Sequence, residues 1–452
     1  MLERWFRLTE SGVTARGEIA AGATTFLAMS YIVLVQPALL ADAGMDVGAV
    51  TAATCLTAAV ASIAMGLWAR YPVALAPGMG INAFFVFQLV PAADAAGHAE
   101  PWRAALGVVF VSGVLFVALS ATGVRERLLA ALSPSLRHAI AAGIGLFITF
   151  LGLRSAGLVE ANPATLVALT RELARADVAI AALGTIVAAA AAARGVRGGI
   201  LLGIGTAAAV AIGLRVLLPL ESLPPSLARL ALPTGLLAAP PSLAPTFFAM
   251  DVGAALTGAL VPFVLVFLFV DVFDTLGTLV AVSEQGGLVR DGKLPRAGRA
   301  FATDAMATVA GACLGTSTVT SYIESAAGIA AGGRTGLVAV VVGIGFPLAM
   351  LVSPVIASLG SYPPITAPAL LMVGAAMLRS VEHVAWGDTT EGLPALLVVV
   401  GIPLTFSIGD GIALGLVAYP LVKTLAGRHR DVRPTLWVVA AALLAYLTVL
   451  RG

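Results

Sequence analysis

Charged side chains are scarce in this sequence, at 11% of 452 residues, whereas about a quarter of an ordinary soluble domain is charged. Cysteine is also rare, because only Cys55 and Cys313 occur, both in apolar stretches that suggest no disulfide framework. The net charge of +2 is too small to indicate a nucleic-acid partner. The four histidines lie in loops or at the ends of apolar stretches, without a metal-ligand cluster or a nucleophile–base pair. These shortages argue against a soluble protein, a metal site and a membrane-embedded hydrolase.

Apolar residues are abundant, at 59% of the chain with a mean hydropathy of +1.00. A membrane-spanning helix needs about 20 predominantly apolar residues. The apolar runs predict an all-α polytopic membrane protein with about 14 transmembrane segments in two sets of seven. The expected spans are Glu18–Leu40, Ala49–Trp68, Pro72–Val90, Ala104–Ala121, Leu136–Leu153, Val178–Ala193 and Gly198–Leu218, followed by Ala254–Val282, Arg299–Leu314, Thr316–Ala331, Thr335–Leu359, Ile365–Leu378, Leu393–Ser407 and Gly409–Leu425.

The loops between these runs divide the chain further. Lys and Arg recur in the loops of one side, together with the N-terminal segment, which indicates a cytoplasmic N-terminus in a multi-pass protein of the cell membrane. The N-terminal segment has no apolar core, so we do not expect a cleaved signal peptide. The apolar tail 435–450 is either a further span or an interfacial helix. The expected parts are a lead-in 1–17, a first seven-span repeat 18–218, a Pro-rich extracellular connection 219–253, a second repeat 254–427 and a C-terminal tail 428–452.

One apolar segment, Gly315–Gly328, is interrupted by polar residues. Its first half is a run of serines and threonines, which are poor helix formers and favour extended backbone. Glu324 follows, and Ala326–Ala331 again has the composition of a helix. We expect a segment that is extended, then helical, with a carboxylate in the first helical turn. Such segments are tolerated in a membrane only where they line a cavity or are buried in protein.

The first set of spans contains a counterpart, Val73–Phe85, with a Gly- and Pro-rich first half. Ile81-Asn82-Ala83 aligns with Ile323-Glu324-Ser325, and each segment is the third span of its set. Because seven is an odd number, the second set enters the membrane inverted relative to the first. Paired interrupted segments in inverted repeats are the best sequence indicator of a transporter binding site.

The eighth span carries two acidic residues, Asp271 and Asp274, on one helical face that Thr275 and Thr278 extend. Each carboxylate at membrane depth costs roughly 2.5–3.5 kcal/mol on insertion scales. Buried acids favour the neutral form, which suits a proton carrier or a hydrogen-bonding partner for a polar heterocycle. The alternative is structural, with each carboxylate bonded to a neighbouring Ser/Thr-rich segment. For Asp304, expected near the membrane interface, we favour a structural role.

Further candidate residues belong to the two interrupted segments. Asn82 offers both a donor and an acceptor, and its alternative role is an amide bond between helices. Gly80 has no side chain, so the backbone there can approach a ligand closely. Phe84 and Tyr322 are typical packing residues, although either ring could stack on a flat ligand.

Three ordered motifs, Ala76–Phe85, Asp271–Thr278 and Thr320–Gly328, resemble the azaguanine-type purine permeases. This is a branch of the nucleobase–cation symporter, or nucleobase–ascorbate transporter, superfamily. The resemblance extends over nearly the whole chain. It implies two inverted seven-span repeats in which spans 3 and 10 are half strand and half helix. It further implies a core domain of spans 1–4 and 8–11 and a gate domain of spans 5–7 and 12–14 that often mediates dimerisation.

The resemblance also implies a function, which is proton-coupled import of adenine, guanine or hypoxanthine without a metal or other cofactor. Asn82, Asp271 and Glu324 match purine-contacting positions, and Asp274 matches the position linked to proton coupling. Phe84 stands where relatives often carry Tyr. Alternatives on the same architecture are transport of uracil, xanthine or an anion, and a channel is less expected. The supporting candidates are Gly80, Phe84, Thr275, Thr278, Tyr322, Ile323 and Ser325.

Overall fold

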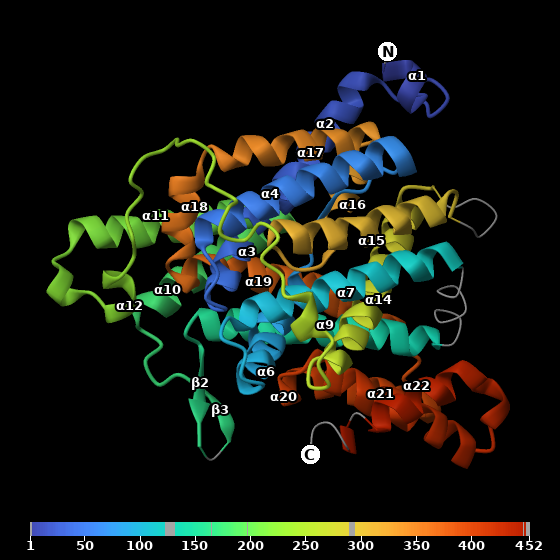
Figure 1. The fold of residues 1–452 in the computed structure, drawn as a ribbon. Helices are drawn as coiled ribbons and strands as arrows, with labels where there is room; N and C mark the ends of the chain where they lie inside the picture. Colours follow the sequence, from blue (N-terminus) through green and yellow to red (C-terminus); the bar gives the residue numbers. More distant parts are fainter. Residues whose placement is uncertain are drawn as a thin grey trace.

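The computed structural model describes residues 2–122, 132–163, 165–196, 198–288, 294–445 and 447–448. Figure 1 shows that the chain is almost entirely helical, with many long helices side by side. Eight helices in the described ranges are long and apolar enough to cross a membrane, or nine if the bent pair α17 (Leu337–Met350) and α18 (Ser353–Gly360) is one span. The expected helical, multi-pass membrane fold is therefore confirmed, while the count of fourteen spans remains a prediction.

The first part of the chain supplies ten helices and three strands among the described residues. These are α1 (Leu2–Phe6), α2 (Ala15–Met29), α3 (Ile32–Ala41), α4 (Val47–Ala64), β1 (Leu75–Pro77), α5 (Met79–Phe84), α6 (Val90–Ala95), α7 (Pro101–Thr122), α9 (Pro134–Ser155), β2 (Val159–Asn162), β3 (Leu166–Leu169), α10 (Ala176–Ala193) and α11 (Gly199–Leu217). Two π-helical turns, Met65–Ala69 and Phe85–Leu89, continue α4 and α5.

The second part supplies twelve further elements among the described residues. Its elements are α12 (Pro225–Ala228), α13 (Val252–Ala255), α14 (Val261–Gln285), α15 (Ala297–Leu314), β4 (Val319–Ser321), α16 (Ser325–Ala330), α17 (Leu337–Met350), α18 (Ser353–Gly360), α19 (Pro363–Leu378), α20 (Thr389–Thr405), α21 (Ile408–Leu425) and α22 (Pro434–Ala445). Three 3₁₀ turns, Leu220–Ser222, Arg379–His383 and His429–Asp431, lie beside α12, α19 and α22.

The first predicted span, Glu18–Leu40, lies within Ala15–Ala41, which is apolar and long enough to cross a membrane. Within it, α2 and α3 are separated by a two-residue turn at Ser30–Tyr31 that the sequence pattern did not indicate. The side chain of Ser30 donates to the backbone oxygen of Leu27 at 3.4 Å, which competes with regular helix bonding. Tyr31 lies at this turn, directly before α3.

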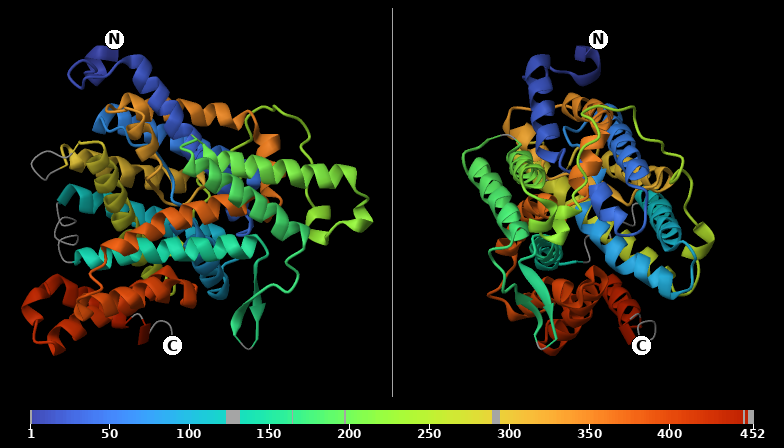
Figure 2. Two further views of the ribbon diagram at one scale, coloured as in Figure 1. Left: turned by 180° about the vertical axis from the view of Figure 1, so that it is seen from behind. Right: turned by 90° about the vertical axis from the view of Figure 1, so that its left-hand side faces the viewer.

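The connections also carry structure that the sequence pattern did not indicate. Strands β2 and β3 pair as an antiparallel hairpin, which lies at the same end of the molecule as α12 (Figure 1). Helix α1 lies at the opposite end, and both views in Figure 2 place α1 and the C-terminal helix α22 at opposite edges of the molecule. At the C-terminus, α22 packs against α21. The last positions of the tail, 446 and 449–452, lie outside the described residues, so the alternatives for 435–450 stay open.

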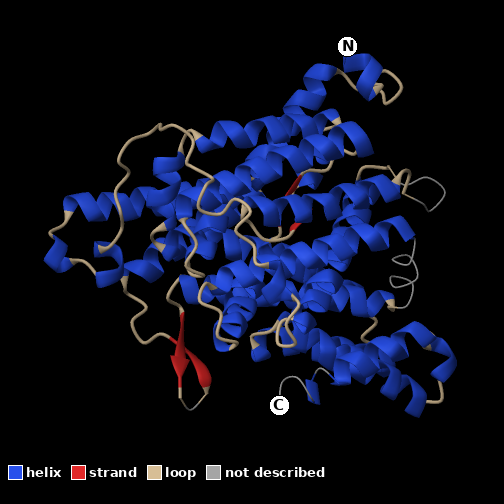
Figure 3. Cartoon of the chain, viewed as in Figure 1, coloured by secondary structure: helices blue, strands red, loops and turns tan. Residues whose placement is uncertain are grey.

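A short antiparallel ribbon lies near the centre of the helices, drawn in red in Figure 3. It pairs β1 with β4, so that Leu75 lies opposite Ser321 and Pro77 lies opposite Val319. Helix α5 follows β1 and α16 follows β4, which confirms the expected change from extended to helical backbone in both segments. Because all ribbon residues are buried, each strand supplies the hydrogen-bond partners that the other needs.

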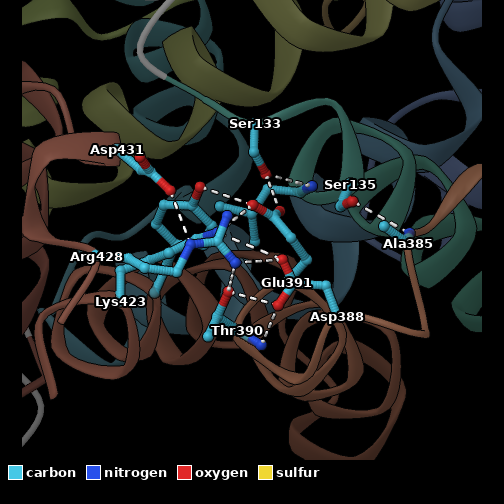
Figure 4. Close-up of polar contacts among 11 residues, drawn as sticks. Ser133, Ser135, Ala385, Asp388, Thr390, Glu391, Lys423, Arg428 and Asp431 are labelled. Carbon is cyan, nitrogen blue, oxygen red and sulfur yellow. Dashed lines mark hydrogen bonds and ion pairs between the residues drawn. The ribbon is translucent and has the colours of Figure 1, made fainter. Parts of the chain in front are cut away.

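A cluster of polar and charged side chains joins α9, α20, α21 and the start of the tail (Figure 4). Lys423 is almost fully buried, and its Nζ lies 2.8 Å from Oε1 of Glu391. Ser133 and Tyr419 also donate to the Glu391 carboxylate, at 2.6 and 2.9 Å. Nearby, hydrogen bonds from Thr390 and Arg428 hold the pKa of Asp388 well below its usual range. The cluster ties these helices into one unit.

This cluster yields a prediction about stability. Glu391→Gln leaves the ammonium of Lys423 buried beside a neutral amide, and breaking a buried ion pair in this way costs about 3–5 kcal/mol. We expect the purified variant to unfold at a clearly lower temperature. Lys423→Met combined with Glu391→Gln removes both charges and should recover most of the loss. A single variant as stable as the unmodified protein would contradict this description of the cluster.

Candidate functional site

The predicted site residues come from three helices that surround the β1–β4 ribbon. Helix α14 supplies Asp271 and Asp274, α5 supplies Asn82, and the N-terminal end of α16 supplies Glu324. Helix α15 packs against β4, and α3 packs against β1. The structure therefore brings together, around one buried element, side chains that are up to 242 positions apart between Asn82 and Glu324.

A chain of hydroxyl and carboxyl groups leads from Asp274 into the interior. The half-buried Asp274 is hydrogen-bonded to the side chain of Thr320 on β4. The Thr320 hydroxyl lies 3.1 Å from that of Thr275, which donates to Oδ2 of Asp304 at 2.6 Å. The Ser321 hydroxyl donates to the other oxygen of Asp304 at 3.3 Å. These contacts form a continuous hydrogen-bonded path between two carboxyl groups.

Asp304 does not occupy the interfacial position that the sequence suggested. It lies in the middle of α15 with no exposed surface, and its carboxylate faces the ribbon and α14. The predicted span began at Arg299, whereas α15 begins at Ala297, and the depth of Asp304 depends on how this helix packs against the ribbon, which the sequence pattern does not specify. A third acid therefore belongs to the same polar cluster as Asp271 and Asp274.

Asp271 lies deeper than Asp274 and is only 1% exposed. Its Oδ2 lies 3.1 Å from the Thr308 hydroxyl, which also lies 3.0 Å from the backbone oxygen of Val319. Thr308 has a single hydroxyl proton, so it can serve only one of these acceptors at a time. Among the described residues, nothing hydrogen-bonds the other oxygen of Asp271. Such a buried, unpartnered oxygen is uncommon in folded proteins and calls for a functional explanation.

Glu324 occupies the N-cap position of α16 and is half-buried. Its Oε1 accepts a hydrogen bond of 2.6 Å from the hydroxyl of Tyr31. That length is typical of a strong bond to an ionised acceptor. The helix N-terminus also favours negative charge nearby because its first backbone N–H groups have no partners within the helix.

Asn82 is fully buried, and both ends of its amide group are occupied in this conformation. Its Nδ2 donates to Oε1 of Gln36 on α3, and its Oδ1 accepts from the hydroxyl of Ser317. Gln36 in turn donates to Ser317 and to Thr316, at 3.3 and 3.1 Å. The structure thus contains the hydrogen bond between amide side chains of two helices that was the alternative role of Asn82.

Several supporting candidates hold the ribbon and its helices rather than face open space. The Tyr322 hydroxyl donates to the backbone oxygen of Pro77 at 2.5 Å, and the Ser325 hydroxyl accepts from the backbone N–H of Ala74 at 3.0 Å. Phe84 is buried against the rings of Phe263 and Phe267.

The glycines and the exposed candidates have different surroundings. A Cβ atom on Gly80 would lie 2.4 Å from Cγ2 of Ile144, so this glycine allows α5 to approach α9 closely. By contrast, Thr278 is half-buried and Ile323 is 39% exposed.

Sequence reasoning did not identify Tyr31 and Gln36. Both belong to an apolar segment that was interpreted as an ordinary span. The available signal was Gln36 itself, an uncharged polar residue among aliphatic neighbours, which in a membrane segment usually has a polar partner on another helix. The partners of both residues lie on other segments, and the bond from Tyr31 to Glu324 joins positions 293 residues apart.

The fold has counterparts among solved structures. The chain is similar to the transmembrane domain of the bicarbonate transporter BicA from a cyanobacterium, with a TM-score of 0.63 over 88% of this chain and 97% of that domain. The sequence identity is 14%, so this similarity establishes the fold alone.

The family follows from the sequence. The model of the Permease family matches residues 16–414, and the chain belongs to this family. It is 44% identical to the putative permease MJ0326 of Methanocaldococcus jannaschii, over 100% of this chain and 99% of the relative. It is 42% identical to the guanine/hypoxanthine permease PbuG of Bacillus subtilis, over the full length of both. It is 41% identical to the adenine permease AdeP of Escherichia coli, over 97% of this chain and 94% of that protein.

These relatives confirm the resemblance that the three sequence motifs indicated. Because the family and the relatives are permeases, the chain is a transporter and not an enzyme. The long apolar helices agree with this, since they make the chain a multi-pass membrane protein.

The packing of α16 generates a prediction. A Cβ atom on Gly328 would lie 2.1 Å from Oγ1 of Thr25 and 2.7 Å from the backbone oxygen of Ala21, so Gly328→Ala must push α16 away from α2. We expect this variant to lose most of its transport activity and to unfold at a lower temperature. The matched control is Gly205→Ala on the exposed face of α11, where a Cβ would meet nothing within 4 Å. Equal behaviour of the two variants would contradict the described packing.

Proposed function

We propose that this protein is a proton-coupled symporter that imports purine nucleobases, namely adenine, guanine and hypoxanthine, across the cell membrane. The observation that carries the proposal is the full-length similarity to permeases named for guanine/hypoxanthine and for adenine. The site supports it physically, because three acids, Asp271, Asp274 and Asp304, and the carboxylate of Glu324 surround a buried ribbon. Such a site suits an uncharged base and a proton better than an anion.

The proposed base-binding residues are Asn82, Asp271 and Glu324. Purine bases present N–H donors and ring nitrogen acceptors on the edge of a flat ring, which carboxyl and amide groups complement. Glu324 supports this role best, since its carboxylate is half-buried at a helix N-terminus and is held through Oε1 by the hydroxyl of Tyr31. Asn82 would have to exchange at least one bond, to Gln36 or Ser317, for one to the base.

Asp274 is the proposed site of proton coupling. It is half-buried, and the Thr320 and Thr275 hydroxyls connect it to the fully buried Asp304. Protonation of Asp274 would remove a charge from a site of low polarity and so favour entry of an uncharged base. The proposal requires no metal and no cofactor, because the proton gradient supplies the driving force.

The proposed architecture has fourteen spans in two inverted seven-span repeats, with a cytoplasmic N-terminus. The antiparallel pairing of β1 with β4, each followed by a short helix, supports an inverted relation between the two halves. In the proposed alternating-access cycle, a core domain of spans 1–4 and 8–11 moves against a gate domain of spans 5–7 and 12–14. The polar cluster around Lys423 and Glu391 would keep part of the gate rigid, and the gate would provide the contact in a homodimer.

The first test is uptake of radiolabelled adenine, guanine, hypoxanthine and uracil by cells that lack their own purine permeases and express this protein. We expect uptake of at least one purine, little uptake of uracil, and loss of accumulation when a protonophore collapses the gradient. Purine flux that ignores the gradient would indicate a channel. Absence of purine uptake with the protein present in the membrane would overturn the proposal.

The second test concerns the acids. Glu324→Gln and Asp271→Asn keep the shape of each side chain but remove its charge and its proton, and we expect each to lower purine uptake by at least tenfold at normal abundance. Asp94→Asn is the matched control, because Asp94 is exposed at the end of α6, away from the ribbon. Unchanged transport by Glu324→Gln or Asp271→Asn would dismiss the assignment of that residue.

A further inference from the structure

Tyr31 lies at the turn between α2 and α3 and is only 1% exposed. Its hydroxyl donates to Oε1 of Glu324 at 2.6 Å, across a sequence separation of 293 residues. We propose that Tyr31 is a positioning residue for substrate binding, which holds the Glu324 carboxylate in one orientation and leaves its other oxygen for the base. The inference rests on the proposed function, because Glu324 is there the principal base-binding group.

Helix α2 ends at Met29, two residues before Tyr31. Helix α2 packs against α16 so closely that a Cβ on Gly328 would overlap the Thr25 side chain and the backbone of Ala21. Backbone contact at this distance leaves α16 little freedom to slide or rotate relative to α2. The first span is therefore the reference against which the position of Glu324 is set.

The far end of α16 is held by the same helix. Glu18, near the start of α2 and with no exposed surface, accepts hydrogen bonds from the backbone N–H groups of Arg334 and Thr335 at 2.7 and 3.0 Å. The guanidinium of Arg334 donates to the backbone oxygens of Ile329 and Gly333, each at 2.7 Å, where α16 ends. Helix α2 thus fixes the loop after α16, and Tyr31 fixes the carboxylate at its other end.

A fixed backbone does not by itself orient a glutamate, whose side chain has three rotatable bonds. Of the described contacts to the Glu324 carboxylate, the Tyr31 hydroxyl is the side-chain donor. Each carboxylate oxygen accepts two hydrogen bonds, so one bond from Tyr31 leaves Oε2 available to an N–H of the base. A donor that holds the carboxylate before the base arrives reduces the conformational entropy that the side chain loses on binding.

Tyr31 acts through Glu324 rather than on the base, because its ring is enclosed and its hydroxyl is directed to the carboxylate. Removal of the hydroxyl should therefore weaken binding of the base more than it slows the transport cycle. It should also have no effect of its own once the Glu324 carboxylate is absent. A residue that merely stabilised the fold would lower the amount of protein and leave the affinity unchanged.

The experiment compares Tyr31→Phe, which keeps the ring, with the unmodified protein in purine uptake. We expect KM to rise roughly tenfold, equivalent to about 1.4 kcal/mol, with the maximal rate per transporter within about twofold. Tyr362→Phe is the matched control, because it removes a tyrosine hydroxyl that donates to the carboxylate of Asp177, remote from the ribbon. The control should leave KM unchanged.

Purine binding to purified protein then completes a double-mutant cycle with Glu324→Gln. We expect Tyr31→Phe to weaken binding by itself and to add little in the Glu324→Gln background. An unchanged KM for Tyr31→Phe, or equal effects in both backgrounds, would overturn the inference while the purine uptake of the unmodified protein still supports the proposed function. Absence of purine uptake by the unmodified protein would overturn the proposed function and this inference with it.

Discussion

The pairing of β1 with β4 is the interaction on which the rest of the structure depends. Extended backbone leaves its N–H and C=O groups without partners inside a strand, and an apolar interior offers no water to replace them. Each strand has only three residues, so neither could remain extended there alone. The two strands satisfy each other, and bonds from Gly78 to Thr318 and from Tyr322 to Ala74 extend the ladder at both ends. Helices α5 and α16 can then begin inside the protein rather than at its surface.

This arrangement explains why so many polar groups are gathered in one place. Helix N-termini inside the protein favour acceptors, and the ribbon needs hydroxyl groups around it to bond its edges. Thr308 bonds both backbone groups of Val319, and the Ser62 hydroxyl bonds both backbone groups of Leu75. The acids then complete the hydroxyl network. An ionised acid is costly to bury at these positions, but a carboxyl group there can take up or release a proton as substrate binds. Structural and functional demands therefore fall on the same residues.

Much of this site could be predicted from the sequence, because its local signals are strong. Runs of Ser and Thr, or of Gly and Pro, interrupt the two segments, and Asp271, Asp274 and Glu324 stand out in apolar surroundings. The remainder depended on long-range packing. The bond from Tyr31 to Glu324 and the amide pairing of Gln36 with Asn82 follow from the placement of α3, which periodicity does not specify. The interior position of Asp304 and the turn between α2 and α3 were missed for the same reason.

The most direct test of the central claim is an experimental structure of the protein with a bound purine. We expect the base to lie beside the N-termini of α5 and α16, within hydrogen-bond distance of the Glu324 carboxylate, with the β1–β4 pairing intact. A base bound elsewhere in the molecule, or a structure in which β1 and β4 are separated, would contradict this expectation.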